Sequence, residues 1–476
     1  MNTTQREDDM DTTGGTSRET PRFHFIGIGG AGMSVVAELL ADRGMVVGGS
    51  DRSDSPALEH LRSLGIDANI GHDPDRVPRD AIVVVSSAVR ASNPELALAR
   101  SRGQRVIHRS QALALAASGM RFVAVAGAHG KTTTSAMLAI ALRGAGLDPS
   151  AAIGGVVAQF HGGAHLGRGD VFVAEADESD GSFLNYSPSI EVVTNIEPDH
   201  LDHYGTREAF EQAFVDFADR LVEGGQLVCC AEDEGARRLA AQMTGRHRVR
   251  TYGRPDHCEV APDVRIEDVV ATDRGSRATI VDGARRIPLE LRVPGVHNVV
   301  NATGAWCAGV DLGVAPDLMA RSLGAFEGTE RRFQFRGEVG SRRLFDDYAH
   351  HPTEVATALA EARTVADGGE VTVVFQPHLY SRTRNFADRF ARALAAADHV
   401  VVTDVYASRE DPIDGVDSSL ITRALPGAHL VHDMHEAARE GASLTPAGGI
   451  LVTMGAGDIT TTGADVLGEW REEATA

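Results

Sequence analysis

The chain has 476 residues, of which 42% are hydrophobic, and its formal net charge is −21. Its length exceeds what one core needs and predicts three domains. So negative a surface would repel nucleic acid, which favours a soluble enzyme of small molecules whose local sites attract anionic ligands. The four cysteines show neither zinc-site spacing nor a disulfide framework, so we expect packing residues in a reducing cytoplasm.

Residues 1–20 are polar and acidic and predict a disordered tail. They contain no apolar segment of the kind found in signal peptides, and no later apolar run is long enough to cross a bilayer. We therefore expect a cytoplasmic protein without a membrane partner.

The segment FHFIGIGGAGMSVVAELL, from Phe23, has the pattern of a strand, a glycine turn and a helix. Gly27, Gly29 and Gly32 fill the template G-x-G-x-x-G, and the next strand ends at Asp51, where a ribose-binding carboxylate is expected. Alone, this pattern indicates a dinucleotide-binding domain of a dehydrogenase. The same glycines also suit any diphosphate above a helix N-terminus, including that of a UDP-sugar.

A second strand, turn and helix occupy residues 121–135, RFVAVAGAHGKTTTS, which contain the only lysine of the chain, Lys131. Backbone N–H groups and the helix dipole attract phosphate at such a turn. The lysine can follow a transferring phosphoryl group, and the Thr132 hydroxyl can bind the magnesium of a nucleoside triphosphate. The match is to the short form G-x-x-G-K-T, because Val125 stands where the eight-residue phosphate-loop pattern has glycine.

Two acidic strand ends follow this loop. One contains Glu175 and Asp177, and the other runs NIEPDHLDHYG. Carboxylates near a phosphate loop bind magnesium directly or through water, although each alone is more often a helix cap or a solvated turn. The candidates in the second run are Asn195, Asp199, His200 and Asp202.

Residues 244–291 predict short strands without recognisable chemistry. The following PGVHNVVNATG places asparagines at the start of a helix, where an amide could read adenine or cap the helix. Residues 323–337 predict a hinge into a third α/β domain, in which His350 and His351 follow a strand ending in two aspartates. Arg382 could pair with a carboxylate, whereas Arg384 is better explained as a solvated helix charge.

Taken in order, these motifs resemble the Mur ligases of peptidoglycan synthesis. The matching segments, from Phe23 to about Thr461, are GIGGAGMS, SSAV, GAHGKTTT, EADESD, NIEPDHLDHYG, GVHNVVNA, RRFQ, DDYAHHPTEV, QPHLYSRT and GAGDI. The resemblance implies an α/β protein of three domains: a Rossmann-like UDP-sugar domain at 21–119, a central P-loop ATPase-like domain at 120–327 and a C-terminal Rossmann-like domain at 328–476.

The resemblance also implies the chemistry. ATP and Mg²⁺ would convert the lactyl carboxylate of UDP-N-acetylmuramate to an acyl phosphate, which the amine of L-alanine attacks. The nearest alternative in the family is recycling of a preformed tripeptide onto the same UDP-sugar. A nicotinamide-dependent dehydrogenase would leave the phosphate loop without purpose, and a non-catalytic nucleotide sensor would need neither acidic strand end.

By resemblance, the catalytic residues are Lys131, His200 and Arg382. The UDP-sugar contacts are Gly27, Gly29, Gly30, Gly32, Asp51, His72, Ser86 and Ser87. The ATP contacts are Gly127, Ala128, His129, Gly130, Lys131, Thr132, Thr133, His297, Asn298, Asn301, Arg332 and Asp346. Thr132 and Glu175 would bind one magnesium and His200 a second, and the amino acid would meet Tyr348, His350, His351 and Arg382.

Two departures from the family pattern concern single positions, and a third difference concerns a helix. Ala128 stands where threonine is usual, and Leu379 replaces an arginine found in many members. Sister ligases hold their second magnesium with a carbamylated lysine on the helix after the position of His200. Here that helix, REAFEQAFVDFADRL, has no lysine, so we expect no carbamate ligand.

Overall fold

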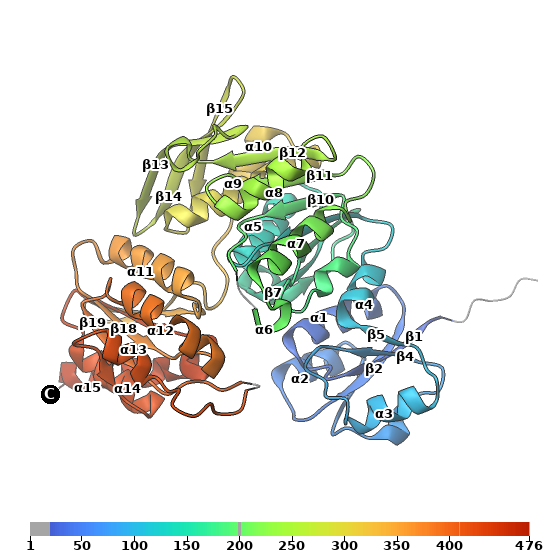
Figure 1. Cartoon of the computed structure of the whole chain (residues 1–476), viewed down its shortest axis with the longest axis horizontal. Helices are drawn as coiled ribbons and strands as arrows, with labels where there is room; N and C mark the ends of the chain where they lie inside the picture. The colour runs from blue at the N-terminus through green and yellow to red at the C-terminus, as the bar shows by residue number, and fades with distance from the viewer. Residues whose placement is uncertain (1–19, 199–200, 409, 476) are drawn as a thin grey trace, which may run out of the picture. The chain divides into compact units, whose positions relative to one another are not determined.

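The computed structural model describes residues 20–198, 201–408 and 410–475. It comprises two compact units, Met1–Arg109 and Ser110–Ala476 (Figure 1). Three separate sheets, one in the first unit and two in the second, organise these residues. The fold is therefore the three-domain α/β architecture that the sequence predicts, whereas the exact boundaries between the domains stay predictions.

The first unit is a doubly wound domain. Its parallel sheet has the order β3-β2-β1-β4-β5, so the order reverses between β1 and β4, where ligands of such folds bind. The strands are β1 (Arg22–Ile26), β2 (Val46–Asp51), β3 (Asp67–Ile70), β4 (Ile82–Val85) and β5 (Val106–His108). The helices are α1 (Ala31–Asp42), α2 (Pro56–Ser63) and α3 (Pro94–Ser101), and α4 (Arg109–Ala116) leads into the second unit.

A sheet of ten strands, in the order β15-β14-β13-β12-β11-β10-β6-β9-β7-β8, forms the central domain. Its strands are β6 (Arg121–Ala126), β7 (Ser150–Val157), β8 (Gly162–His165), β9 (Val171–Glu175), β10 (Ile190–Val193), β11 (Gln226–Cys230), β12 (Arg248–Gly253), β13 (Val264–Thr272), β14 (Gly275–Asp282) and β15 (Arg285–Leu291). The pairs from β7 through β9, β6, β10, β11 and β12 to β13 are parallel, and β8, β14 and β15 add antiparallel edges.

Helix α5 (Lys131–Gly144) is the centre of this domain. Every residue from Thr132 to Leu142 is buried, because the helix lies between the sheet and α9 (Val296–Asp311) and α10 (Pro316–Leu323). A helix that is apolar on all sides needs such complete cover. The remaining helices of the domain are α6 (Leu201–Tyr204), α7 (Arg207–Ala218) and α8 (Glu234–Met243). Of the cysteines, Cys229, Cys230 and Cys307 are buried and Cys258 is partly buried, and all four are free thiols.

The C-terminal domain contains a sheet of order β16-β17-β21-β18-β19-β20 with a buried cluster on each face. Its strands are β16 (Gln334–Val339), β17 (Arg342–Asp347), β18 (Val371–Phe375), β19 (His399–Val402), β20 (His429–Leu430) and β21 (Ile450–Met454). Its helices are α11 (Pro352–Ala366), α12 (Tyr380–Leu394), α13 (Ser419–Ala424), α14 (Met434–Leu444) and α15 (Gly463–Thr475). The predicted hinge at 323–337 was partly wrong, because β16 begins within it at Gln334 and pairs antiparallel with β17.

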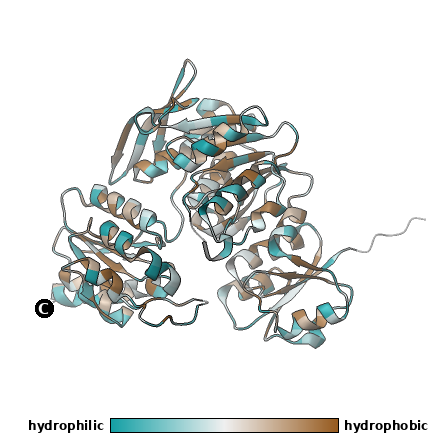
Figure 2. Ribbon diagram, in the orientation of Figure 1, coloured by the Kyte–Doolittle hydropathy of each residue, from teal (hydrophilic) through white to brown (hydrophobic). Residues whose placement is uncertain are grey.

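Apolar residues concentrate in the strands of the sheets, and polar residues cover the outer faces of the helices (Figure 2). Among the described residues, no helix combines the length and the apolar character that crossing a bilayer requires.

Candidate active site

The phosphate loop, Gly127 to Gly130, joins β6 to α5, and its backbone is fixed by the end of β10. The N–H of His129 donates to Asn195 Oδ1 at 2.9 Å, and its carbonyl oxygen accepts from Thr194 Oγ1 at 2.6 Å. Gly127 has φ +137° and Gly130 has φ +81°, which favour glycine. A Cβ on Gly127 would lie 2.2 Å from Thr194 Oγ1. The backbone conformation of the loop therefore depends on glycine at these positions and on its contacts with Thr194 and Asn195.

Lys131 is held by a buried carboxylate that the sequence did not single out. Its Nζ donates to Glu178 Oε1 at 3.0 Å and to the carbonyl oxygen of Gly127 at 2.6 Å. Burial alone would lower the pKa of Lys131, but the neighbouring carboxylates, Glu178 foremost, raise it above its ordinary value. The ammonium is therefore charged at neutral pH and lies beside the N-terminus of α5, where phosphate would bind.

Thr132 and Glu175 form a pair of hard oxygen donors beside this lysine. The Thr132 hydroxyl donates to Glu175 Oε2 at 3.0 Å, and the N–H of Gly154 donates to the same oxygen at 2.8 Å. Magnesium prefers such ligands and keeps several waters, so the residues fit this ion. His200, the predicted ligand of a second magnesium ion, lies outside the described residues, as does Asp199. Asp177 accepts a hydrogen bond from the N–H of Ser179 at 3.0 Å.

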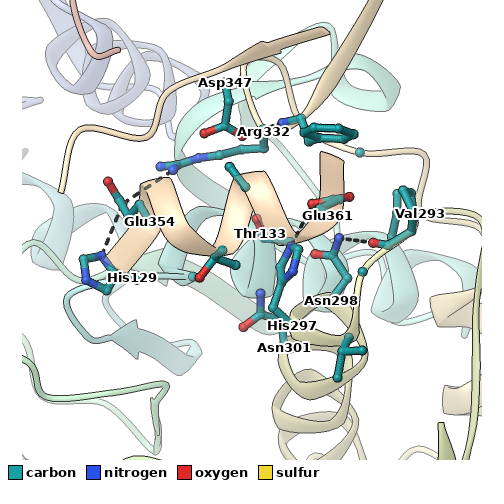
Figure 3. A pocket seen from close by; sticks show the side chains of 18 of the residues that line it. His129, Thr133, Val293, His297, Asn298, Asn301, Arg332, Asp347, Glu354 and Glu361 are labelled. Atoms are coloured by element: carbon teal, nitrogen blue, oxygen red, sulfur yellow. Dashed lines mark hydrogen bonds and ion pairs between the residues drawn. The ribbon is translucent and has the colours of Figure 1, made fainter. Parts of the chain in front are cut away.

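A cavity of about 1200 Å³ opens beside the phosphate loop (Figure 3). Such a volume is ample for a nucleotide. Its lining comes from the loop, from α9 and from the C-terminal domain, and it includes His129, Thr132, Thr133, His297, Asn298, Asn301, Arg332, Asp347, Glu354 and Glu361. Most of the predicted ATP contacts thus surround one space.

The helix start of α9 supplies the side of this cavity predicted for adenine. Asn298 does not cap the helix; its Nδ2 donates to the carbonyl oxygen of Pro294 at 2.6 Å, and Gly295 is the N-cap. Asn301 lies against the phosphate loop, because a Cβ on Gly130 would come within 2.8 Å of its Oδ1. The asparagines therefore lie on the cavity wall, and their contact with adenine stays a prediction.

His297, on the same helix, meets Glu361 of α11 with 3.2 Å between Nε2 and Oε2. Burial lowers the pKa of His297 to about 4 and raises the pKa of Glu361 well above its ordinary value. His297 is therefore uncharged at neutral pH, and burial favours the uncharged form of Glu361 as well.

The two aspartates at the end of β17 differ in position. Asp346, predicted to bind the ribose, is 1% exposed and accepts hydrogen bonds from Thr453 at 2.8 Å and Thr460 at 2.6 Å. Asp347 lines the cavity instead. Burial raises the pKa of Asp347 to about 6, although the charge of Arg332 opposes the rise. The ribose contact of Asp346 remains a prediction that would require these threonine bonds to rearrange.

Arg332, the predicted phosphate contact, also lines the cavity. Its guanidinium lies 5.3 Å from the ring centre of Tyr348 and 3.8 Å from Glu354 Oε1. Cation–π contact and charge pairing hold the group in place while its remaining donors stay available.

Three of the predicted amino-acid contacts gather around His378, which the sequence did not single out. The ring centroids of Tyr348 and His350 are 5.3 Å apart, and those of His350 and His378 are 5.6 Å apart. Arg382 Nη1 lies 3.4 Å from His378 Nδ1. Leu379, which replaces the family arginine, has φ +69°, a strained conformation of the kind that clusters at functional sites.

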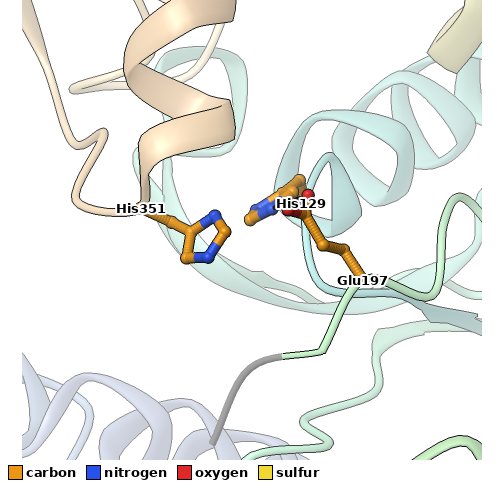
Figure 4. A group of neighbouring side chains, drawn as sticks. All are labelled: His129, Glu197 and His351. Carbon is orange, nitrogen blue, oxygen red and sulfur yellow. Dashed lines mark ion pairs between the residues drawn. The ribbon is translucent and has the colours of Figure 1, made fainter. Parts of the chain in front are cut away.

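His351, the fourth predicted amino-acid contact, lies against the phosphate loop. Its ring centroid is 5.0 Å from that of His129 (Figure 4). Glu197 and Glu354 pair with the two ring nitrogens of His129 at 3.4 and 3.2 Å. The sequence did not single out either glutamate, because nothing in the runs NIEPDH and HHPTEV marks which acid faces a histidine.

The first unit holds its own candidate site. The N–H of Gly29 donates to Asp51 Oδ2 at 2.9 Å, which joins the glycine turn to the end of β2. Ser50 lies 2.9 Å from His72 Nδ1 and donates to buried Glu95 at 2.6 Å. Of the other predicted contacts, Ser87 Oγ lies 3.2 Å from His108 Nε2, and Ser86 is partly buried. Three glycines shape the turn: Gly27 has φ +81°, Gly30 is the N-cap of α1, and a Cβ on Gly32 would clash with Arg109.

Comparison with known proteins bears on all three domains. The profile of the Mur ligase family catalytic domain matches residues 22–121, that of the Mur ligase middle domain 125–309, and that of the Mur ligase glutamate ligase domain 331–457. The UDP-N-acetylmuramate–L-alanine ligase of Kineococcus radiotolerans is 54% identical over 94% of this chain and 95% of its own. That of Renibacterium salmoninarum is 51% identical over 94% and 95%.

Solved structures agree with these sequence relatives. The UDP-N-acetylmuramate–alanine ligase MurC of Thermotoga maritima has a TM-score of 0.78 and 29% identity, and the match covers 96% of this chain and 100% of that one. A murein peptide ligase of Psychrobacter arcticus has a TM-score of 0.70 at 24% identity, and the match covers 94% of this chain and 98% of that one. This second likeness concerns the fold alone.

Proposed function

Because the chain belongs to the Mur ligase family, we propose that it joins L-alanine to the lactyl carboxylate of UDP-N-acetylmuramate while ATP is cleaved to ADP and phosphate. One arrangement carries the proposal: Lys131 begins α5, the next residue, Thr132, is hydrogen-bonded to Glu175, and Thr132 lines a cavity of about 1200 Å³. The curated relatives bear the name of this reaction over nearly their whole length. The substrates are small molecules of the cytoplasm, where we place the enzyme.

The reaction needs ATP because an ionised carboxylate repels nucleophiles. Its oxygen attacks the γ-phosphorus, and ADP leaves as an acyl phosphate forms. Lys131 is suited to neutralise charge that builds on the phosphates, since its ammonium lies 3.0 Å from Glu178 at the start of α5. Thr132 and Glu175 would hold magnesium, which would neutralise negative charge on the phosphates.

The second half of the reaction needs a positioned amine. We assign this to the group around His378, in which Arg382 can pair with the carboxylate of L-alanine and His350 and Tyr348 lie next to His378 in a chain of ring contacts. The alanine nitrogen attacks the acyl carbon, phosphate leaves, and the amine gives up a proton. Alignment of the two substrates supplies most of the acceleration in such a step.

The proposal is tested by phosphate release from ATP with UDP-N-acetylmuramate and, in turn, L-alanine, glycine, L-serine or the tripeptide used in recycling. L-Alanine should give the highest kcat/KM, and omission of Mg²⁺ should abolish turnover. Turnover with the tripeptide but not with L-alanine would refute the assignment, as would strict dependence on a nicotinamide cofactor.

A further inference from the structure

Two histidines and one glutamate converge between the central and C-terminal domains. His129 comes from the phosphate loop, Glu197 from the segment after β10, and His351 from the residue before α11. Their ligand atoms all lie within 4.8 Å of one another, and the side chain of His351 is completely buried (Figure 4). His129 is also a predicted ATP contact and His351 a predicted amino-acid contact, but neither prediction explains why the three side chains converge.

The spacing of these atoms suits one small ion. His129 Nε2 lies 3.4 Å from Glu197 Oε2. Two ligands at about 2.0 Å from a tetrahedral zinc ion are separated by roughly 3.3 Å. This pair is therefore already at the separation that an ion would impose, and His351, whose ligand atom lies within 4.8 Å of the other two, would need to come closer by at most about 1.5 Å.

Each of the first two ligands is also oriented by a neighbour on its other side. Glu354 Oε1 lies 3.2 Å from His129 Nδ1, which leaves Nε2 to face Glu197. The second oxygen of Glu197 accepts from Thr353 Oγ1 at 2.8 Å and from Arg389 Nη2 at 2.6 Å. A carboxylate behind a histidine and donors behind a carboxylate are the outer contacts that metal ligands usually have.

The backbone of this site is rigid as well. The peptide of His129 is bonded on both sides by Asn195 and Thr194, at 2.9 and 2.6 Å. The N–H of His351 donates to Glu354 Oε2 at 3.2 Å. The same glutamate therefore orders His129 from the C-terminal domain and the start of α11, so the two histidines are positioned together.

We propose that His129, Glu197 and His351 form a binding site for a divalent transition-metal ion, zinc foremost, distinct from the magnesium site at Thr132 and Glu175. Two imidazoles and one carboxylate suit zinc, and three protein ligands leave a fourth position open. Magnesium demands oxygen ligands in an octahedron and would not select this set. A bound ion would link the phosphate loop to the first turn of α11.

The test uses the full chain, freed of metal by a chelator and then titrated with Co²⁺ followed by Zn²⁺, without substrates. Cobalt in a tetrahedral site of nitrogen and oxygen ligands absorbs visible light, so one equivalent should produce this absorption and zinc should abolish it. His351→Gln and Glu197→Gln should each weaken binding at least about tenfold, and Glu354→Gln should weaken it by about 10–100-fold.

The matched control is His432→Gln, because His432 is also paired with a carboxylate, Asp404 Oδ1 at 2.8 Å, but its side chain is 76% exposed. This variant should bind cobalt like the parent chain. Absence of a stoichiometric spectrum, or an unchanged spectrum in Glu197→Gln, would overturn the proposal. Thermal unfolding identifies any variant that does not fold. If His351→Gln does not fold, the cobalt spectrum of Glu197→Gln tests the proposal in its place. Since no step needs ATP or the UDP-sugar, the ligase assignment stands or falls separately.

Discussion

The turns that precede α1 and α5 have the same length and serve different ends. Each joins a central parallel strand to a helix through four residues, 27–30 in the first unit and 127–130 in the second. Both are anchored to the end of a neighbouring strand, through the Ser50 carbonyl oxygen in one and Thr194 with Asn195 in the other. Their backbones therefore provide the same device for binding a diphosphate.

The side chains around the two turns differ sharply. The first turn of α1 has no charged residue, and the nearest carboxylate, Asp51, accepts a backbone N–H from Gly29. The first turn of α5 begins with Lys131 and is faced by Glu175 and Glu178. A backbone turn alone can hold a substrate, whereas moving a phosphoryl group requires charges that match the changing charge of the transition state. The comparison assigns binding to the first turn and chemistry to the second.

Lys131→Met should have the largest effect and should act on one turn only. We expect kcat to fall about 10³-fold, because a preorganised charge on the transferring phosphoryl group is lost. The affinity for UDP-N-acetylmuramate should stay within about twofold, because we predict that the other turn binds it. Steady-state kinetics and calorimetric titration of the UDP-sugar measure the two quantities.

Its matched control separates catalysis from stability. Removing Lys131 leaves Glu178 buried without its cation, which destabilises a protein by about 3–5 kcal/mol. Lys131→Met combined with Glu178→Gln should recover most of the free energy of unfolding and none of the activity. Recovery of activity in the double variant would contradict the role given to Lys131.

The pH dependence of stability should arise from the second turn. Burial lowers the pKa of His129, but its bonds to Glu197 and Glu354 outweigh this and raise it to about 9. The folded state thus favours the protonated form, so the stabilisation is complete below pH 6.5 and is lost as the pH rises through 9. At about 1.4 kcal/mol per pKa unit, the loss is at most about 3.5 kcal/mol.

Urea unfolding between pH 6 and pH 10, in the presence of a chelator, measures this effect. Both glutamates stay ionised over that range, since the net effect of their partners holds the pKa of each below its ordinary value. His129→Gln should flatten the profile between pH 6.5 and pH 9. An unchanged slope in that variant would assign the pH dependence to other groups.

Glu175→Gln should raise the magnesium concentration that half-saturates turnover and lower kcat about 10²-fold. The amide still accepts from Thr132 and from the N–H of Gly154, so unfolding should change by less than about 1 kcal/mol. Asp177→Asn is the matched control, because Asp177 lies on the same strand end and accepts from the N–H of Ser179. Equal magnesium requirements in the two variants would remove Glu175 from the metal site.

Asp51→Asn should have a smaller effect, confined to the first turn. Loss of a charged acceptor for a ribose hydroxyl weakens UDP-sugar binding by about tenfold. The affinity for ATP should not change, which a fluorescent nucleotide analogue can report. An equal loss of affinity for the UDP-sugar and for ATP would contradict the assignment of the two ligands to different turns.

Local patterns predicted the fold and the two turns because strand, glycine and helix signals lie within about fifteen residues of each other. Lys131, Thr132 and Glu175 could be found in the same way, since each stands at a fixed place in a motif. Their roles remain predictions of the motif. What the structure adds is their mutual distance, which local sequence does not contain.

Glu178 and Glu354 could not be found in this way. The run EADESD has four acids, and their burial depends on how the chain folds back toward Lys131. Glu354 stands where a helix cap is expected. It also pairs with His129 of another domain, which is 225 residues earlier in the sequence (354 − 129). The strand β16 was missed because its glycine, Gly337, and exposed side chains are typical of a loop.

The last prediction is that bicarbonate has no effect on activity, and it again concerns Lys131. Helix α7, where sister ligases place a carbamylated lysine, is Arg207–Ala218 and contains none. Lys131 is the only lysine of the chain, and its raised pKa leaves almost no free amine, which carbamate formation requires. Activity should therefore be the same with and without bicarbonate at constant pH. An amine-selective reagent should modify Lys131 slowly, and ATP should protect it. Loss of activity when carbon dioxide is stripped, restored by bicarbonate, would mean that Lys131 is carbamylated and that the charge of the second turn has the opposite sign.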